Sequence, residues 1–315
     1  MKKATLLVFC CTALMFIAGC SPTSSETSTV RVALLPILDS LPIHVAQSEG
    51  YFQDQGVEVE VIPVASAPER DQLIQSGQAD AMINELVSVI FYNQQEINVV
   101  AVRFARAATT DVPVFRIVAS GASGIEAVAD LAGASIGISE GTVIEYTTDR
   151  LLESAGLSPD QVEKVAVPKI PDRLNLLSSG QLDAANLPDP AASVALLQGG
   201  KLVIDDTAYP QVGHSVITFD AEFVKQNPGT VRAFLAAVEK AVSAINADKH
   251  RWDQLLLDEN LLPPPLLGTY TLPSYPAASV PSKAQFEDAL QWAQEKGLVS
   301  DGVPYQDSVS DAYLP

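Results

Sequence analysis

The chain has 315 residues, of which 38 are acidic and 19 are basic, so its formal net charge at pH 7 is −19. So acidic a chain is not expected to bind nucleic acid, because that function needs a basic surface. All three cysteines (Cys10, Cys11 and Cys20) lie near the N-terminus, so we expect no disulfide, thiolate metal site or cysteine nucleophile in the folded part.

The first residues have the pattern of an exported and processed chain. Two lysines precede an apolar stretch, Ala4 to Ala18, that is too short to span a bilayer comfortably. The segment Ile17-Ala18-Gly19-Cys20 resembles a bacterial lipobox, which implies cleavage before Cys20 and attachment of lipid such as palmitate. We therefore expect a lipoprotein signal peptide over 1–19 and a flexible polar tether over 20–29. An ordinary signal peptide with an incidental cysteine is the alternative.

Strands and helices are expected to alternate along the rest of the chain. Apolar runs that suit strands start near Val30, Val57, Ala81, Val99, Val114, Ala134, Lys201 and His214. Helices are expected over about 40–50, from Thr142 to about Gly156, over 230–247 and over 283–296. A further helix is expected to follow the strand at Ala81 directly and to run to about Asn93. This alternation predicts an α/β fold with mostly parallel sheets flanked by helices.

Residues 65–83 and 168–186 align with each other without a gap, at an offset of 103. The matched residues are Arg70 with Arg173, Gly77-Gln78 with Gly180-Gln181, and Asp80-Ala81 with Asp183-Ala184. Two copies are too few for a solenoid, so the repeat predicts two similar α/β lobes with a ligand between them. Chance similarity of two α/β units is the alternative.

The lobes are expected to be formed by discontinuous parts of the chain. Lobe one is expected to comprise 30–119 and 211–315, and lobe two 120–210. Two crossings of the chain, near 115–121 and 210–217, would then form a two-strand hinge.

Ligands of parallel α/β sheets collect where strands end and helices begin. Unpaired backbone N–H groups and hydroxyl or amide side chains at such junctions suit a sulfonate, phosphate or carboxylate. The candidate ligand-binding residues are Asp39, Ser40, Leu41, Ser66, Asn84, Glu85, Ser139, Gly141, Thr142 and Asp189. For Ser40, Ser139 and Asn84, a purely structural role as a helix cap is an equal alternative.

Acidic residues near these junctions (Glu85, Glu140, Glu145 and Asp189) fit a purely anionic ligand poorly. A ligand with amino or ring N–H groups would explain them, as would a solvated protein surface. The three histidines (His44, His214 and His250) are dispersed and have no metal-site spacing, so neither a metal nor another cofactor is expected. No phosphate-binding loop, dinucleotide fingerprint or nucleophile elbow is present in the sequence.

Several further segments belong with the lipobox: Pro42 to Phe52 with Gln55-Gly56-Val57, Ser76 to Asp80, Asp130 to Gly137, and Trp292 to Leu298. Together these segments resemble the solute-binding proteins of ABC importers, in the group that binds nitrate, taurine, alkanesulfonates and pyrimidine precursors of thiamine. The resemblance covers essentially the whole mature chain. It implies a two-lobed periplasmic-binding-protein fold that closes on a small solute and needs no cofactor. Asn84-Glu85 and Leu187-Pro188-Asp189 fit neither a taurine nor a nitrate pattern.

The resemblance further implies a monomeric protein in the cell envelope, lipid-anchored outside the cytoplasm, with an ABC permease and ATPase as partners. A membrane-tethered sensor that presents its ligand to a receptor is the main alternative. An enzyme is a weaker one, because the related eukaryotic pyrimidine-synthesising enzyme carries a cysteine-rich motif that this chain lacks. Cytosolic lyases of menaquinone synthesis share the general fold, but a lipobox argues against them.

Overall fold

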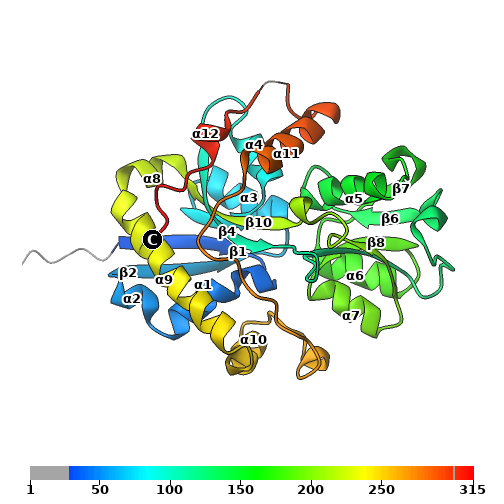
Figure 1. Cartoon of the computed structure of the whole chain (residues 1–315), viewed down its shortest axis with the longest axis horizontal. Helices are drawn as coiled ribbons and strands as arrows, with labels where there is room; N and C mark the ends of the chain where they lie inside the picture. The colour runs from blue at the N-terminus through cyan, green and yellow to red at the C-terminus, as the bar shows by residue number, and fades with distance from the viewer. Residues whose placement is uncertain (1–27, 301) are drawn as a thin grey trace, which may run out of the picture.

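A computed structural model describes residues 28–300 and 302–315. Its two sheets lie side by side, each covered by helices (Figure 1). The predicted signal peptide, Cys20 and most of the predicted tether lie outside the described residues. The last two tether positions, Ser28 and Thr29, begin the first strand. Within the described residues, no helix is both long and apolar enough to cross a membrane.

The first sheet has five strands in the order β2-β1-β3-β10-β4. Their bounds are β1 Ser28–Leu34, β2 Val57–Pro63, β3 Ala81–Asn84, β4 Val99–Ala107 and β10 His214–Asp220. β1 pairs in parallel with β2 and β3, whereas β10 runs antiparallel to β3 and β4. β10 therefore returns from a distant part of the chain and completes this sheet.

The helices around the first sheet come from both ends of the described chain. They are α1 Leu41–Ser48, α2 Tyr51–Asp54, α3 Ala67–Gln75, α4 Leu86–Tyr92, α8 Ala221–Gln226, α9 Pro228–Ala247, α10 Asp253–Asp258, α11 Lys283–Glu295 and α12 Tyr305–Ser308. α9 begins two residues before the predicted helix because proline at the first helical position lacks only an N–H that would be unpaired anyway.

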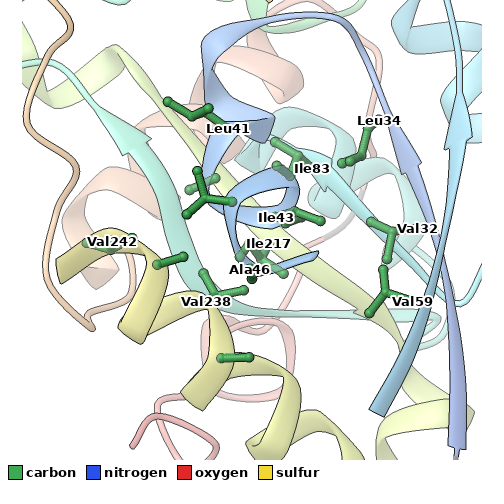
Figure 2. Packing of buried hydrophobic residues seen from close by; sticks show 14 of the residues in the cluster. Val32, Leu34, Leu41, Ile43, Ala46, Val59, Ile83, Ile217, Val238 and Val242 are labelled. Atoms are coloured by element: carbon green, nitrogen blue, oxygen red, sulfur yellow. The ribbon is translucent and has the colours of Figure 1, made fainter. Parts of the chain in front are cut away.

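The largest core cluster joins α1 and α9 to the first sheet. Figure 2 shows Ile43 of α1 between the strand residue Val32 and Val238 of α9, and all three side chains are completely buried. α9 also buries Val231, Phe234 and Val242. Burial of a side chain of this size stabilises the fold by roughly 1.5–3 kcal/mol, so this interface anchors the C-terminal helices on the sheet.

The second sheet also has five strands, in the order β7-β6-β8-β5-β9. Their bounds are β5 Phe115–Ala119, β6 Ser135–Ile138, β7 Glu163–Ala166, β8 Ala184–Pro188 and β9 Lys201–Asp205. The helices are α5 Val143–Ser154, α6 Ile170–Ser178 and α7 Ala191–Leu197. β5 runs antiparallel to both neighbours, as β10 does in the first sheet.

The sequence repeat is confirmed as a structural repeat. α3 and α6 start and end at the same offset of 103 residues. The turn after each helix contains a glycine with positive φ, Gly77 at 67° and Gly180 at 72°, a conformation that glycine adopts without steric cost. The following glutamines then make matching bonds to serine hydroxyls, Gln78 to Ser76 and Gln181 to Ser179. The predicted α/β fold with two similar lobes is thereby confirmed.

The chain crosses between the two sheets twice, at 108–114 and 206–213. The expected lobe boundary placed residues 115–119 with lobe one, but they form β5, which pairs within the second sheet. Asp206 ties the two crossings together, because its carboxylate accepts hydrogen bonds from the backbone N–H groups of Val114 (2.9 Å) and Phe115 (3.0 Å).

Candidate functional site

A narrow cavity lies between the two sheets, at the ends of their central strands. The first-sheet side contributes Asp39, Arg70, Asn84, Glu85 and His214. The second-sheet side contributes Phe115, Ser139, Thr142, Arg173 and Pro188. The cavity volume is about 60 Å³. One water molecule needs roughly 10–15 Å³, so in this conformation the cavity holds only a very small solute.

An apolar groove of about 990 Å³ adjoins this cavity. Leu35, Ile37 and Ile170 line both spaces, so the groove leads directly into the cavity. Val64 and Leu174 extend the apolar lining on either side. The site therefore combines a polar inner end with an apolar entrance, an arrangement that is typical of small-molecule sites.

Five of the ten predicted ligand-binding residues line the cavity: Asp39, Asn84, Glu85, Ser139 and Thr142. Asp39 is buried, and its Oδ2 accepts a hydrogen bond of 2.5 Å from the Ser215 hydroxyl. Its Oδ1 lies 3.5 Å from Nη1 of Arg106 and has no hydrogen-bond partner. Asp39 thus holds an unused acceptor oxygen beside the cavity.

Glu85 presents a second unused acceptor. One carboxylate oxygen, Oε2, accepts from Arg70 Nη1 at 3.1 Å, while Oε1 has no hydrogen-bond partner and the residue is only 4 % exposed. Burial raises the pKa of Glu85, against the opposing effects of Arg70 and of the Val143 backbone N–H. A ligand donor at Oε1 would replace the solvation that this carboxyl loses on burial.

Ser139 and Thr142 differ although both lie at the start of α5. The Ser139 hydroxyl is buried without a partner, so it is available to a ligand. The Thr142 hydroxyl accepts from the Ile144 backbone N–H (3.2 Å) and donates to the Ser139 carbonyl oxygen (2.8 Å). Thr142 therefore caps the helix, the structural role that such residues commonly have.

Asn84 is likewise bonded within its own half of the molecule. Its amide oxygen accepts from the Thr218 hydroxyl at 2.5 Å, and its amide nitrogen donates to the Ser88 hydroxyl at 3.2 Å. These bonds fix β3 to β10 and to α4. They leave Asn84 little capacity for a ligand.

The other five predicted residues lie away from the cavity lining. Ser40 donates to the Ile37 carbonyl oxygen, Leu41 is packed in the core, and Ser66 caps α3. The backbone N–H of Gly141 donates to Glu145. Asp189 is held by Arg116 at 2.7 Å and also accepts from the Tyr270 hydroxyl. Each of these groups is occupied by the protein itself.

The cavity residues that sequence reasoning missed include Arg70, Arg173 and His214. The repeat had already paired Arg70 with Arg173, and this was the available signal. His214 is buried and packs edge-on against Phe104, with ring centroids 5.6 Å apart. Burial lowers its pKa to about 4, so its imidazole is neutral at pH 7.

Residues 28–300 and 302–315 contain no group of three or more His, Cys, Asp or Glu side chains arranged to hold a metal ion.

Comparisons with known proteins agree with this architecture. The alkanesulfonate-binding protein SsuA from Xanthomonas axonopodis pv. citri superposes with a TM-score of 0.76 at 19 % identity, over 91 % of this chain and 99 % of that chain. The ligand-binding component of an ABC-type import system from Staphylococcus aureus also gives 0.76, at 15 % identity, over 91 % of this chain and 97 % of that one. These likenesses confirm the two-lobed fold.

A sequence relative is named as an enzyme. It is the 4-amino-5-hydroxymethyl-2-methylpyrimidine phosphate synthase THI13 of Saccharomyces cerevisiae, 26 % identical over 243 residues, which are 71 % of this chain and 68 % of the relative. The model of the family described as NMT1/THI5 like matches residues 38–250, which is more than half of the chain. The chain therefore belongs to the NMT1/THI5-like family.

Proposed function

We propose that this chain is the substrate-binding subunit of an ABC importer and that it captures a small organic solute between its two sheets. The fold supports the proposal, because solved proteins of the same architecture include an alkanesulfonate-binding protein and a component of an ABC-type import system. The cavity supports it independently, because both halves of the molecule contribute polar groups to one enclosed space.

The observation that carries the proposal is the set of unused polar atoms around the cavity. Glu85 Oε1, Asp39 Oδ1 and the Ser139 hydroxyl are buried and have no hydrogen-bond partner. Leaving a buried polar group unsatisfied costs roughly 1–3 kcal/mol, so several such groups at one place favour a site that a ligand completes.

In this proposal, the two halves of the molecule close on the solute by rotation about the two crossings at 108–114 and 206–213. Rotation about these segments would open the cavity towards the apolar groove and close it again over a solute. A permease would then recognise the closed form, whose population the ligand raises by binding it more tightly than the open form. An ATPase would drive release, and no covalent chemistry on the solute is required.

Anchoring through Cys20 belongs to the same proposal. Lipid on Cys20 would hold the protein outside the cytoplasm at the membrane, within reach of its permease. Replacing Cys20 by serine should move the protein from the membrane fraction to the soluble fraction of lysed cells. Mass spectrometry of the N-terminal peptide should find a diacylglyceryl group on the wild-type cysteine. A C20S protein that stays with the membrane would contradict this anchoring.

The binding function is tested by native mass spectrometry together with thermal unfolding. The ligand panel holds taurine, alkanesulfonates, nitrate, thiamine, aminopyrimidines and riboflavin. A true ligand at about 100 times its Kd stabilises the folded protein by roughly 2.7 kcal/mol, which raises the melting temperature by several degrees. The matched variants are Ser139→Val, which removes a cavity hydroxyl, and Ser48→Val on the exposed end of α1.

We expect Ser139→Val to weaken the ligand-induced shift and Ser48→Val to leave it unchanged. Equal effects of the two variants would contradict placement of the ligand in this cavity.

The name of the yeast relative favours one second candidate, an enzyme that acts on a pyrimidine compound. The two functions differ in what happens to the bound molecule. Mass spectrometry of the ligand after prolonged incubation with the protein separates them. Recovery of unchanged ligand is expected for a binding subunit, and a converted product would support the enzyme.

A further inference from the structure

The C-terminal helix α11 connects the two halves of the molecule on one side of the cavity. Figure 1 shows it beside α5, a helix of the second sheet. One side of α11 belongs to the first half, because Phe286 and Ala293 share a core cluster with Leu86 and Ile90 of α4. Another side of α11 bonds to α5. The contact between α5 and α11 therefore joins parts of the chain that would separate if the cavity opened.

Trp292 of α11 lies at the centre of this contact. Its ring packs edge-on against Tyr146 of α5, with ring centroids 5.6 Å apart, and its indole N–H donates to Oδ2 of Asp149 at 2.9 Å. The Tyr146 hydroxyl donates in the opposite direction, to Oδ2 of Asp288 on α11, at 2.5 Å. Trp292, Tyr146 and Asp149 are buried, so water has little access to these bonds.

Ion pairs extend the contact towards solvent. Lys296, the residue after α11, lies 3.0 Å from Oε1 of Glu145 and 3.1 Å from Oδ2 of Asp149. Nε of Arg150 on α5 lies 3.2 Å from Oδ2 of Asp288 on α11. The Lys296 side chain is 30 % exposed, so water weakens its ion pairs and each contributes modestly.

The charged groups of α5 also have partners in their own half of the molecule. Lys164 of β7 lies 3.0 Å from Glu145 and 2.5 Å from Asp149, and Glu153 lies 2.9 Å from Arg150. A buried charge that loses its only counter-ion is very costly. Because these partners would move with α5, separation from α11 leaves none of the three charges unpaired. The contact can therefore break and form again at moderate cost.

α5 also forms part of the cavity. Its first residue, Val143, lines the cavity, and the Val143 N–H crosses to the other half, where it bonds to the Glu85 carboxylate. Oε2 of Glu145 accepts from the backbone N–H of Gly141 at 2.9 Å, so the carboxylate that contacts Lys296 also fixes the loop before α5. Separation of α5 from α11 would thus break the Val143 bond and widen the cavity.

We propose that the contact between α5 and α11 is a latch that favours the closed arrangement of the two halves before a solute binds. The latch consists of Tyr146, Asp149 and Arg150 on α5 with Asp288, Trp292 and Lys296 of the C-terminal segment. It supplies part of the free energy of closure, so that the solute has to supply only the remainder. This inference rests on the closure included in the proposed function, but its test requires no solute.

Amide hydrogen exchange, followed by NMR on the protein produced from its full-length gene, tests the latch. The Val143 N–H bonds across the two halves, so its exchange requires opening and detects even rare open forms. The Asp80 N–H bonds within the first half, to the Arg31 carbonyl oxygen at 2.8 Å, and serves as an internal reference. Faster exchange at Val143 alone would therefore report opening of the latch.

Two variants weaken the latch, and a third is the matched control. Lys296→Met removes the charge and keeps most of the aliphatic side chain, and loss of such an ion pair should raise the Val143 exchange rate up to about fivefold. Tyr146→Phe removes only the hydroxyl that bonds to Asp288, and the rate should rise about tenfold. Lys283→Met should leave the rate unchanged, because Lys283 pairs with Glu287 inside α11. Exchange at Asp80 should stay as in the wild type in all three.

Equal Val143 exchange rates in Lys296→Met, Tyr146→Phe and Lys283→Met would overturn the latch. An equal acceleration at Val143 and Asp80 would also overturn it, because it would indicate a general loss of stability. If the variants behave as expected while no compound of the ligand panel binds, the latch stands and the binding function fails. If a compound binds while both latch variants exchange at Val143 as slowly as the wild type, the latch fails and the binding function stands.

Discussion

His214 provides a test of how the buried polar groups around the cavity respond to pH. Its imidazole is 2 % exposed and packs against Phe104. Burial lowers its pKa from 6.5 to about 4, although a nearby carboxylate, Asp288, favours the protonated form. The folded protein thus excludes a proton that the unfolded chain binds at mildly acidic pH, and folding must become less favourable as pH falls.

The magnitude follows from the two pKa values. Each unit of difference corresponds to about 1.36 kcal/mol, so the whole shift amounts to about 3 kcal/mol of unfolding free energy. This contribution is fully present above pH 6.5 and is lost progressively as pH falls towards 4. Between pH 7 and pH 5 the loss that linkage predicts is about 2 kcal/mol.

The assay is urea unfolding of the wild type and of His214→Phe across this pH range. Phenylalanine keeps a ring against Phe104 and removes the titrating group. The wild type should lose about 2 kcal/mol more than the variant on going from pH 7 to pH 5, after both are extrapolated to water. Parallel pH profiles for the two proteins would refute a buried neutral histidine at this position.

Two further substitutions test the hinge and the site. Gly213→Ala would place a Cβ atom 1.8 Å from Oδ2 of Asp206. Urea unfolding should therefore show a loss of about 1–3 kcal/mol in the stability of this variant. The control Gly229→Ala, which has open space around the added Cβ atom, should not lose stability in this way. A G213A protein as stable as G229A would contradict the close packing of the crossings. Thr142→Ala removes a helix cap and should lower stability by about 1 kcal/mol, and ligand affinity should fall only modestly because its hydroxyl is already occupied. A larger loss of affinity than of stability, on the same free-energy scale, would show that Thr142 binds the ligand directly.

The two-lobed fold was predictable because the repeat keeps its turn chemistry. Gly77 and Gly180 have the positive φ that their turns require, and an ungapped offset of 103 carries one unit onto the other. The place of β5 was harder to foresee than that of β10, which lies in the expected second segment of lobe one, 211–315. β5 pairs with strands far away in the sequence, and a local pattern of apolar residues does not specify such partners. The assignment of 115–119 to lobe one failed for this reason.

The site was predictable only in part, because a strand-end position does not reveal whether a side chain is already bonded. Asp189 follows β8 as expected, but Arg116 and Tyr270 hold its carboxylate away from the cavity. Glu85 follows β3 in the same way and keeps a free oxygen. The difference arises from residues distant in sequence, which only the folded chain brings together.

The central claim is that a solute binds between the two halves and closes them. The most direct measurement is the distance between spin labels at Glu69 and Asp172, equivalent exposed positions at the starts of α3 and α6. Cys20 is the only natural cysteine after the predicted signal peptide, and serine can replace it. Cysteines introduced at Glu69 and Asp172 would then be the sole thiols available for labelling. The account predicts that a saturating ligand shortens and narrows the distance distribution. Tight binding with an unchanged distribution would contradict it.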